Sequence, residues 1–273
     1  MLYRPASVLI GLLLAWPALA QTPSPLAYWQ YAVGEVLEGS QDEPPPEWAI
    51  TLGGGALVEP KFEGAKRYQG EPSVIVDIRY RDVAFASDGE GIGVNLLHGK
   101  NYRAGVALAY DLGRDQHDDP HLRGLGNIDA APEAKLFAEY FLLPVVVSAA
   151  LHQAIGGHNG LLGELGAYIP LPLFDQKLII FTGPTLTLAD GEYMRSYFGV
   201  SAKQAAATSL RQYSAHGGFK STGWGVTAVY RLDDNWLIES DFAYERLIGD
   251  AASSPIVETS SQFTAGVNLA YRF

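Results

Sequence analysis

The sequence predicts an all-β protein, an antiparallel β-barrel that spans a membrane, and three observations predict it. First, residues 263–273 alternate without interruption between apolar and small or polar side chains, the period of a β-strand, and end on Phe273. Second, no stretch after residue 20 approaches a transmembrane helix, although 48% of the chain is hydrophobic. Alternating lipid-facing and lumen-facing residues cancel in any hydropathy average, as they do in barrels. Third, 30 glycines, 15 tyrosines and 5 tryptophans are typical of such barrels.

The first 20 residues have the layout of a secretory signal peptide. Arg4 precedes an apolar run over residues 8–16, and the small-residue site 18–20 follows it. A retained membrane anchor is the alternative, but the run is shorter than the roughly 20 residues that a helical span needs. We therefore expect cleavage after Ala20, export through the inner membrane, and a mature chain that begins at Gln21.

Composition excludes several classes of function. The chain has no cysteine, so disulfides and thiol chemistry are excluded. Its formal net charge is −11, and removing Arg4 with the signal peptide makes it −12. Nucleic-acid binding needs clustered Lys and Arg, so we expect no nucleic-acid partner.

Residues 21–47 are interpreted as an N-terminal periplasmic linker ahead of a single barrel domain, residues 48–273. Three consecutive prolines, residues 44–46, favour extended polyproline II and cannot join a β-ladder. The stretch 29–36 is more apolar than a linker requires, so a short docked segment is the alternative.

The barrel domain contains twelve strand-like runs. A bulged single strand over 82–97 would reduce the number to ten. The expected strands are 48–58, 72–80, 82–86, 91–97, 102–111, 133–142, 145–155, 161–170, 177–188, 218–231, 235–247 and 260–273. Twelve strands place the short turns at 81, 98–101, 143–144, 171–176 and 233–234 at one end and the long connections 59–71, 112–132, 189–217 and 248–259 at the other, as in bacterial outer-membrane barrels.

The two faces of these strands agree with a membrane barrel. Three aromatic pairs, each eight residues apart, lie on apolar faces, and eight residues of a tilted strand climb roughly 20 Å. These pairs are Tyr102 and Tyr110, Trp236 and Tyr244, and Phe263 and Tyr271. The opposite faces carry Asp77, Arg79, Arg103, Lys135, Glu139, Glu164, Arg231, Glu239, Asp241 and Arg272. Five basic and five acidic groups should pair across a narrow lumen rather than select an ion. We also expect Gly105 and Ala107, on the lumen face, to tolerate polar replacements.

Four short segments resemble the MipA/OmpV family of outer-membrane proteins. They are EPKFEGA at 59–65, AYDLGR at 109–114, LRGLGNID at 122–129 and SYFGV at 196–200. The terminal Phe273 fits as well, and the resemblance covers about residues 48–273. It implies a barrel in the cell outer membrane, in contact with outer-membrane lipid. The family's founding member is described as a scaffold that links a lytic transglycosylase to a bifunctional peptidoglycan synthase; other members are described as outer-membrane antigens or adhesins.

From this resemblance we expect a scaffold or partner-binding protein, whose partners could be a periplasmic murein hydrolase and peptidoglycan synthase. A small or weakly conducting pore for small solutes is the alternative, and an outer-membrane hydrolase is third. For the hydrolase, Ser148, His152, His158 and His216 supply suitable residue types, but neither a GxSxG elbow nor an ordered triad is visible. We therefore expect no enzyme activity and predict no catalytic, cofactor-binding or metal-binding residues.

Two long connections hold further candidates. Asp111, Arg114, Asp115, His117, Asp118, Asp119 and His121 could include ligands for a divalent cation, but they lack EF-hand or HExxH spacing and are interpreted as a solvated loop. Gly124 and Gly126 are interpreted as turn residues with positive φ. In the loop 189–217, Ser201 and Gln204 match a capping box, which predicts a short helix that either narrows the lumen or lies outside. The sequence leaves the oligomeric state open.

Overall fold

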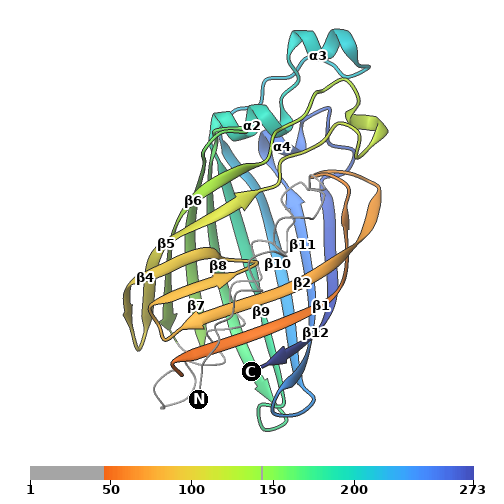
Figure 1. Cartoon of the computed structure of the whole chain (residues 1–273). Coiled ribbons are helices and arrows are strands. Elements are labelled where there is room, and N and C mark those ends of the chain that lie inside the picture. The colour runs from red at the N-terminus through yellow and green to blue at the C-terminus, as the bar shows by residue number, and fades with distance from the viewer. Residues whose placement is uncertain (1–45, 143) are drawn as a thin grey trace, which may run out of the picture.

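The structure is a computed structural model that describes residues 46–142 and 144–273. Twelve antiparallel strands close into one barrel in sequence order, with β1 paired to β12 (Figure 1). The strands are β1 (Trp48–Pro60), β2 (Tyr68–Tyr80), β3 (Ala84–Ser87), β4 (Gly91–Gly99), β5 (Tyr102–Asp111), β6 (Ala131–Leu142), β7 (Val145–Ala154), β8 (Leu161–Leu173), β9 (Leu178–Ala189), β10 (Gly218–Arg231), β11 (Trp236–Leu247) and β12 (Ser261–Arg272). The helices are η2 (Pro120–Leu122), α2 (Gly191–Phe198), α3 (Ala202–Ala207) and α4 (Gly249–Ala252).

The predicted barrel and its twelve strands are confirmed, including the separation of β3 from β4. The largest shift is at β2, which begins at Tyr68 instead of residue 72. Its first residues, Tyr-Gln-Gly-Glu-Pro, have no apolar alternation, but they pair with β1 along their whole length. Regular strand pairing here overrides a weak local pattern.

The connections segregate to opposite ends of the barrel, as predicted. The short-turn end carries the turns 81–83, 100–101, 174–177 and 232–235, and the C-terminus lies there (Figure 1). The long-loop end carries the connections 61–67, 112–130, 190–217 and 248–260, with α2, α3 and α4. The antiparallel pairing of the strands is sufficient to place the two sets of connections at opposite ends of the barrel.

The strand faces alternate as the sequence predicts. In β6, each residue from Ala131 to Tyr140 alternates between buried and exposed. Aromatic rings gather on the outer face near both ends. The ring centroids of Trp236 and Tyr271 are 5.0 Å apart at the short-turn end, and those of Tyr68 and Phe263 are 4.7 Å apart at the long-loop end. Two such girdles bound the apolar band of an outer-membrane barrel.

The expectation that Gly105 tolerates polar replacements is wrong. A Cβ there would lie 2.1 Å from the carbonyl oxygen of Val94 and 2.8 Å from the ring of Phe137. The backbone of β4 and an aromatic side chain therefore occupy the space that any larger residue would need.

The lumen contains an apolar core at mid-barrel and toward the short-turn end. Side chains from seven strands pack together there: Ile75, Val146, Tyr168, Ile179, Phe181, Val229, Leu237 and Ala270. Phe181 and Val146 are completely buried. This core was not predicted, because on the inner face only the charged residues stand out in the sequence. Within the described residues, no helix is long and apolar enough to cross a membrane.

Candidate functional site

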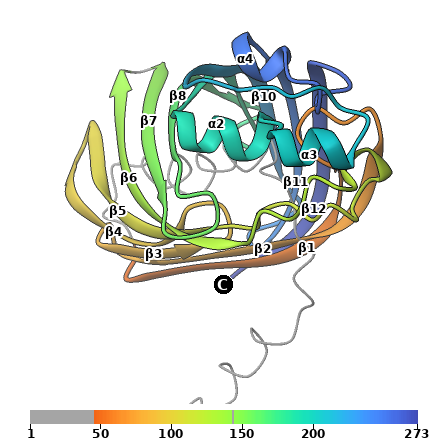
Figure 2. The same ribbon diagram turned by 90° about the horizontal axis from the view of Figure 1, so that it is seen from above.

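The long connections fold together over one mouth of the barrel. We call residues 61–67, 112–130, 190–217 and 248–260 the cap. Seen along the barrel axis, α2 lies across the mouth and α3 lies beside it (Figure 2). The loop 189–217 therefore does both things that the sequence left open: α2 lies across the mouth of the lumen, and the predicted capping-box helix, α3, lies outside.

Local sequence explains how α2 forms. Asp190 caps its first turn by accepting a hydrogen bond from the backbone N–H of Tyr193 at 2.8 Å. Four side chains on the inner side of this helix are buried: Tyr193, Met194, Tyr197 and Phe198. They pack on Leu162 and Leu247 of the wall and on Ala251 of α4. Burial of this apolar face holds the helix over the lumen.

A hydrogen-bonded cluster ties α2 to the end of β5. The hydroxyl of Tyr197 donates to the carboxylate of Asp111, at 2.9 and 3.0 Å from its two oxygens. The same carboxylate accepts from the backbone N–H of Gly113 at 2.6 Å and contacts Nε2 of His158 at 2.9 Å. Burial, and then the charge of Asp111, raise the pKa of Tyr197, so its hydroxyl stays a donor.

Arg114 provides a second tie. Its Nη1 donates to the backbone oxygen of Tyr197 at 2.8 Å, which satisfies a carbonyl in the last turn of α2. Burial lowers the pKa of Arg114 to about 10, so the guanidinium remains charged at neutral pH.

Glu63 and Lys220 form a buried pair beneath the cap. The ammonium of Lys220 contacts the carboxylate of Glu63 and lies 3.4 Å from Glu245. Gln262 joins the cluster by donating to Glu245 at 2.6 Å and accepting from the N–H of Gly64 at 2.7 Å. Desolvation raises the pKa of Glu63 to about 7 despite the opposing effect of Lys220.

An apolar cluster joins all four connections of the cap. Phe62, Leu122, Leu125, Val200 and Ile256 are buried against one another. At its rim, Arg67 is paired with the buried Asp119, and Lys61 donates to the backbone oxygen of Asp118 at 3.1 Å. The connection 112–130 is thereby fixed to the connection 61–67.

The four segments that carry the family resemblance all contribute to this one region. Phe62 and Glu63 come from EPKFEGA, Asp111 and Arg114 from AYDLGR, Leu122 and Leu125 from LRGLGNID, and Tyr197 and Val200 from SYFGV. They are far apart in the sequence and touch only because the barrel brings the loops to one end. Gly124 and Gly126 have φ of 93° and 78°, which confirms their predicted role as turn residues.

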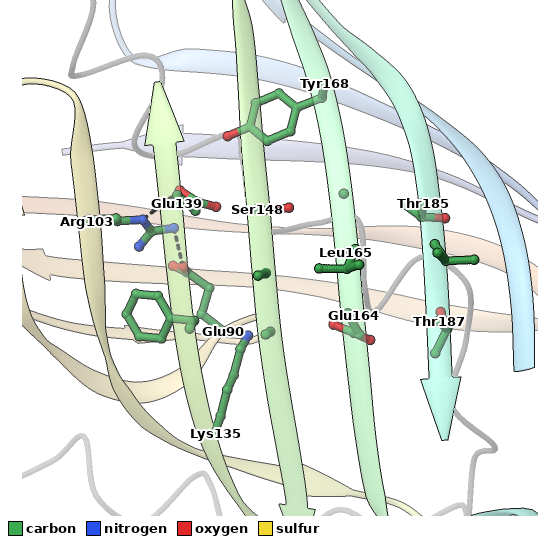
Figure 3. Close-up of a pocket in the computed structure, with 15 residues that line it drawn as sticks. Glu90, Arg103, Lys135, Glu139, Ser148, Glu164, Leu165, Tyr168, Thr185 and Thr187 are labelled. Carbon is green, nitrogen blue, oxygen red and sulfur yellow. Dashed lines mark hydrogen bonds and ion pairs between the residues drawn. The ribbon is translucent and has the colours of Figure 1, made fainter. Parts of the chain in front are cut away.

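A network of charged side chains lies on the inner wall (Figure 3). Arg103 donates to Glu139, its directly opposed partner on β6, at 2.8 Å and to Glu90 at 2.7 Å. Glu90 also accepts from Arg79 at 2.6 Å. The predicted pairing of opposite charges on adjacent strands is confirmed for Arg103 and Glu139, but the ion pairs of this network run along the wall and not across the lumen. Glu90 was missed because it lies in a turn.

A cavity of about 50 Å³ adjoins this network. Its lining includes Glu90, Arg103 and Lys135 together with the small residues Ser148, Ala150 and Gly166 (Figure 3). The cavity exists because these small side chains leave part of the inner wall unfilled. It has room for water or a small ion rather than for a large solute.

The candidate metal ligands of the loop 112–132 are engaged in hydrogen bonds and ion pairs, several of them within the loop. Asp115 contacts Nδ1 of His117 at 2.7 Å, and Asp119 caps η2 by accepting from the N–H of His121 at 2.8 Å. Acidic and histidine groups do meet at Asp111, Glu133 and His158. However, Nδ1 of His158 accepts from the N–H of Gly160, so Nε2 carries the proton that faces Asp111. A metal at Nε2 would require that proton to leave, so this geometry favours a hydrogen-bonded cluster.

The residues considered for hydrolysis do not come together. Ser148 lines the cavity, whereas His152 on the same strand lies between Glu133 and Glu164, at 3.3 and 3.2 Å. His158 is bonded to Asp111, and His216 is exposed and bonded to Asp250 at 2.9 Å. No hydrogen bond joins Ser148 to a histidine within residues 46–142 and 144–273.

Comparisons with known proteins agree with the fold and compartment. A family model described as MltA-interacting protein MipA matches residues 52–273. Outer membrane protein OmpV of Vibrio cholerae is 26% identical over 235 residues, which cover 83% of this chain and 87% of that protein. Outer membrane protein Omp26La of Vibrio anguillarum is 28% identical over 209 residues, or 76% of each chain. Among solved structures, the KdgM porin is similar with a TM-score of 0.42 and 9% identity, covering 82% of this chain and 99% of that one. This chain is an outer-membrane β-barrel protein, as predicted.

Proposed function

The chain belongs to the MltA-interacting protein MipA family, and from this premise we propose that it is a closed outer-membrane barrel that binds a protein partner and is not a diffusion pore. One observation carries the proposal: side chains obstruct the axial path through the barrel at two levels. Inward-facing apolar side chains of seven strands pack together toward the short-turn end, and α2 lies across the other mouth. A pore needs a continuous wet path, which packed apolar side chains deny.

The partner we propose is a murein enzyme of the MltA type, the interaction for which the family is named. Such an enzyme would approach from the periplasm, and short turns face the periplasm in bacterial barrels. We therefore place the short-turn end and the segment before Trp48 on the partner's side. Residues 21–45 of this segment lie outside the described residues, as does the signal peptide.

Conductance tests whether the barrel is closed. We expect the mature chain in planar bilayers to give no stable single-channel steps. Because the path is obstructed at two levels, Phe181→Ala with Val146→Ala should introduce measurable conductance only when the connection 190–217, which carries α2, is also replaced by a short turn. Stable steps from the unaltered chain would contradict the proposal and favour the pore.

Co-purification tests partner binding. The mature chain, solubilised in detergent, should retain a lytic transglycosylase from the same envelope. Deletion of residues 21–42 should leave heat-modifiable gel mobility unchanged and remove the enzyme if the partner binds that segment. Retention after deletion would move the binding surface to the short turns, and no captured wall enzyme with either form would contradict the scaffold role.

A hydrolase receives no support from the geometry, because Ser148 has no adjacent base. The control is direct: Ser148→Ala should leave any ester hydrolysis by the purified chain unchanged.

A further inference from the structure

The wall of the barrel is interrupted beside β2. On one side, β2 pairs with β1 along its whole length, from Tyr68 to Tyr80. On the other side, it pairs with β3 only from Asp77 to Tyr80. Figure 1 shows β2 (orange) continuing past the tip of the β3–β4 hairpin toward the long-loop end with no strand along that edge. Residues 68–75 therefore form an open sheet edge.

The sequence of this edge is suited to having no strand partner. At Val76, the N–H donates to Asp88 at 3.0 Å and the oxygen accepts from the N–H of Asp88 at 3.0 Å, so the backbone groups of Val76 point away from β1. Every second residue points the same way, which places Val74, Pro72 and Gly70 on the open edge. Pro72 has no N–H to leave unpaired there. In the described part of the chain, no backbone hydrogen bond joins Val74 or Gly70 to an element on this side.

Segments of the chain border the interruption on all sides. The hairpin tip, residues 87–90, forms its lower rim, and Glu90 ties that tip to both walls through Arg79 and Arg103. The connection 112–130 passes above it and is held to the far side by the pairing of Arg67 with Asp119. We call this opening, bounded by residues 68–76, 87–90 and 109–111 and by the cap, the wall opening.

Polar and charged groups at the wall opening lie within an apolar surface. Asp88, at the hairpin tip, is exposed. Its carboxylate accepts one backbone hydrogen bond, and no ion pair joins it to a cation in the described residues. The outward side chains around it are apolar, with Val74 45% exposed, Ile92 70% and Leu108 57%. Lipid does not tolerate an open sheet edge or a lone carboxylate, and ionisable groups at membrane depth mark ligand or ion pathways.

We propose that the wall opening is a lateral binding site for amphiphilic cations that partition into the outer membrane, with Asp88 holding the cationic head and the surface of Val74, Ile92 and Leu108 holding the apolar tail. Charge complementarity supports a cation, because Asp241 lies near enough to Asp88 to act on it electrostatically and adds negative charge, whereas the nearby Asp77 is paired with Arg79 at 3.0 Å. The apolar rim supports a tail. Axial closure makes the side of the barrel the route of access. The site is independent of any periplasmic partner.

A photolabelling experiment tests the site. The full mature chain in phosphatidylcholine vesicles is exposed to dodecyltrimethylammonium carrying a diazirine in its chain, and adducts are mapped by mass spectrometry. We expect adducts to concentrate on residues 72–76 and 87–92. Asp88→Asn keeps an oxygen for the N–H of Val76 but removes the charge, and should reduce this labelling by about tenfold, the effect of losing one ion pair of 1.4 kcal/mol. Asp234→Asn, in a turn at the short-turn end, is the matched control and should leave labelling unchanged.

Three results would overturn the proposal. They are equal labelling by a dodecyl sulfonate probe, labelling unaffected by Asp88→Asn, and competition by tetramethylammonium, which has no tail.

Thiol accessibility provides a second test that does not depend on the probe. The chain has no cysteine, so single cysteines can be placed without background. In vesicles, Asp88→Cys should react with a water-soluble cationic methanethiosulfonate, as should His117→Cys in the cap, whereas Leu151→Cys on the lipid-facing side of β7 should not. An unreactive Cys at position 88 in a folded barrel would mean that the wall is sealed.

Discussion

At the long-loop end, four connections of this barrel enclose a small core of their own, whereas the turns at the short-turn end enclose nothing. Phe198 in the cap is completely buried, and Asp111 accepts three hydrogen bonds. In the turn 174–177, Phe174 is 75% exposed. Phe174, Asp175 and Gln176 have φ of 51°, 54° and 65°, a region that non-glycine residues rarely adopt.

The difference shows how the two ends are stabilised. The cap depends on its own packed apolar groups and buried polar bonds, so its stability should respond strongly to single substitutions. The short turns depend on the strands that they connect, so they tolerate strained backbone and exposed apolar groups. They also remain free to contact other molecules.

The largest expected difference in unfolding free energy is between alanine substitutions of one phenylalanine in the cap and one in a short turn. Phe198→Ala should lower the free energy of unfolding by about 3–5 kcal/mol, because it leaves a cavity among buried side chains. Phe174→Ala should change it by less than about 0.5 kcal/mol. Urea unfolding in lipid vesicles and protease cleavage of the cap measure both variants. Equal effects would remove the distinction between the ends.

The free energy of unfolding should depend on pH through Glu63, a residue of the cap. The pKa of Glu63 is raised to about 7, so the folded cap binds a proton that the unfolded chain releases near pH 4.5. Stability from this group is therefore present below pH 4.5 and is lost as the pH rises through 7, by at most roughly 3 kcal/mol. Unfolding free energies at pH 5 and 8 measure the loss.

The control for this pH dependence is Glu63→Gln, which cannot titrate. The difference between the two pH values should be smaller in this variant than in the unaltered chain. A slope that the substitution leaves unchanged would assign the dependence to groups other than Glu63.

The hydroxyl of Tyr197 should contribute more to the free energy of unfolding than a tyrosine hydroxyl near the short-turn end. Tyr197→Phe leaves Asp111 without one buried donor and should cost about 1–3 kcal/mol in unfolding free energy. For Tyr230, near the short-turn end, no hydroxyl hydrogen bond is found within the described residues, and Tyr230→Phe should stay within about 0.5 kcal/mol. Urea unfolding of the two variants in parallel makes the comparison, and a cap insensitive to Tyr197→Phe would mean that this cluster does not hold α2.

The smallest expected changes in unfolding free energy come from substitutions at positions with positive φ, and they should have opposite signs at the two ends of the barrel. Gln176→Gly should stabilise the barrel by about 0.5–1 kcal/mol, because glycine adopts positive φ without strain. Gly126→Ala in the cap, where φ is 78° and no atom lies within 4 Å of the new Cβ, should destabilise by a similar amount through the backbone alone. Shifts of the urea midpoint with the same sign would indicate that these φ values do not control stability.

Much of the fold could be predicted because it depends on local pattern. Alternation along β12 and β6 defines both faces of each strand, and the lengths of the connections define the two ends. Ser201 and Gln204 likewise form the predicted capping box, since a helix start depends on residues only three apart. α2 was not predicted, because its helix is stabilised by burial over the lumen more than by its own propensity.

The candidate site was beyond prediction because its contacts are long-range. Asp111 and Tyr197 are separated by 86 residues, and Glu63 and Lys220 by 157. The sequence indicates a solvated loop for Asp111 and no role for Tyr197, Glu63 or Lys220. The signal that could have found them was the presence of family-like segments in different loops at the same end of the barrel.

The sequence by itself determined an outer-membrane barrel of twelve strands, the outward apolar face and the end that carries the long connections. These properties follow from a period of two residues, which each strand expresses without its neighbours. Only the tertiary structure decided that α2 lies across one mouth, that apolar side chains of seven strands pack together inside the barrel, and that β2 pairs with β3 only from Asp77 to Tyr80, beside Asp88. Closure of a barrel fixes strand register and stagger together, and these determine which distant side chains meet.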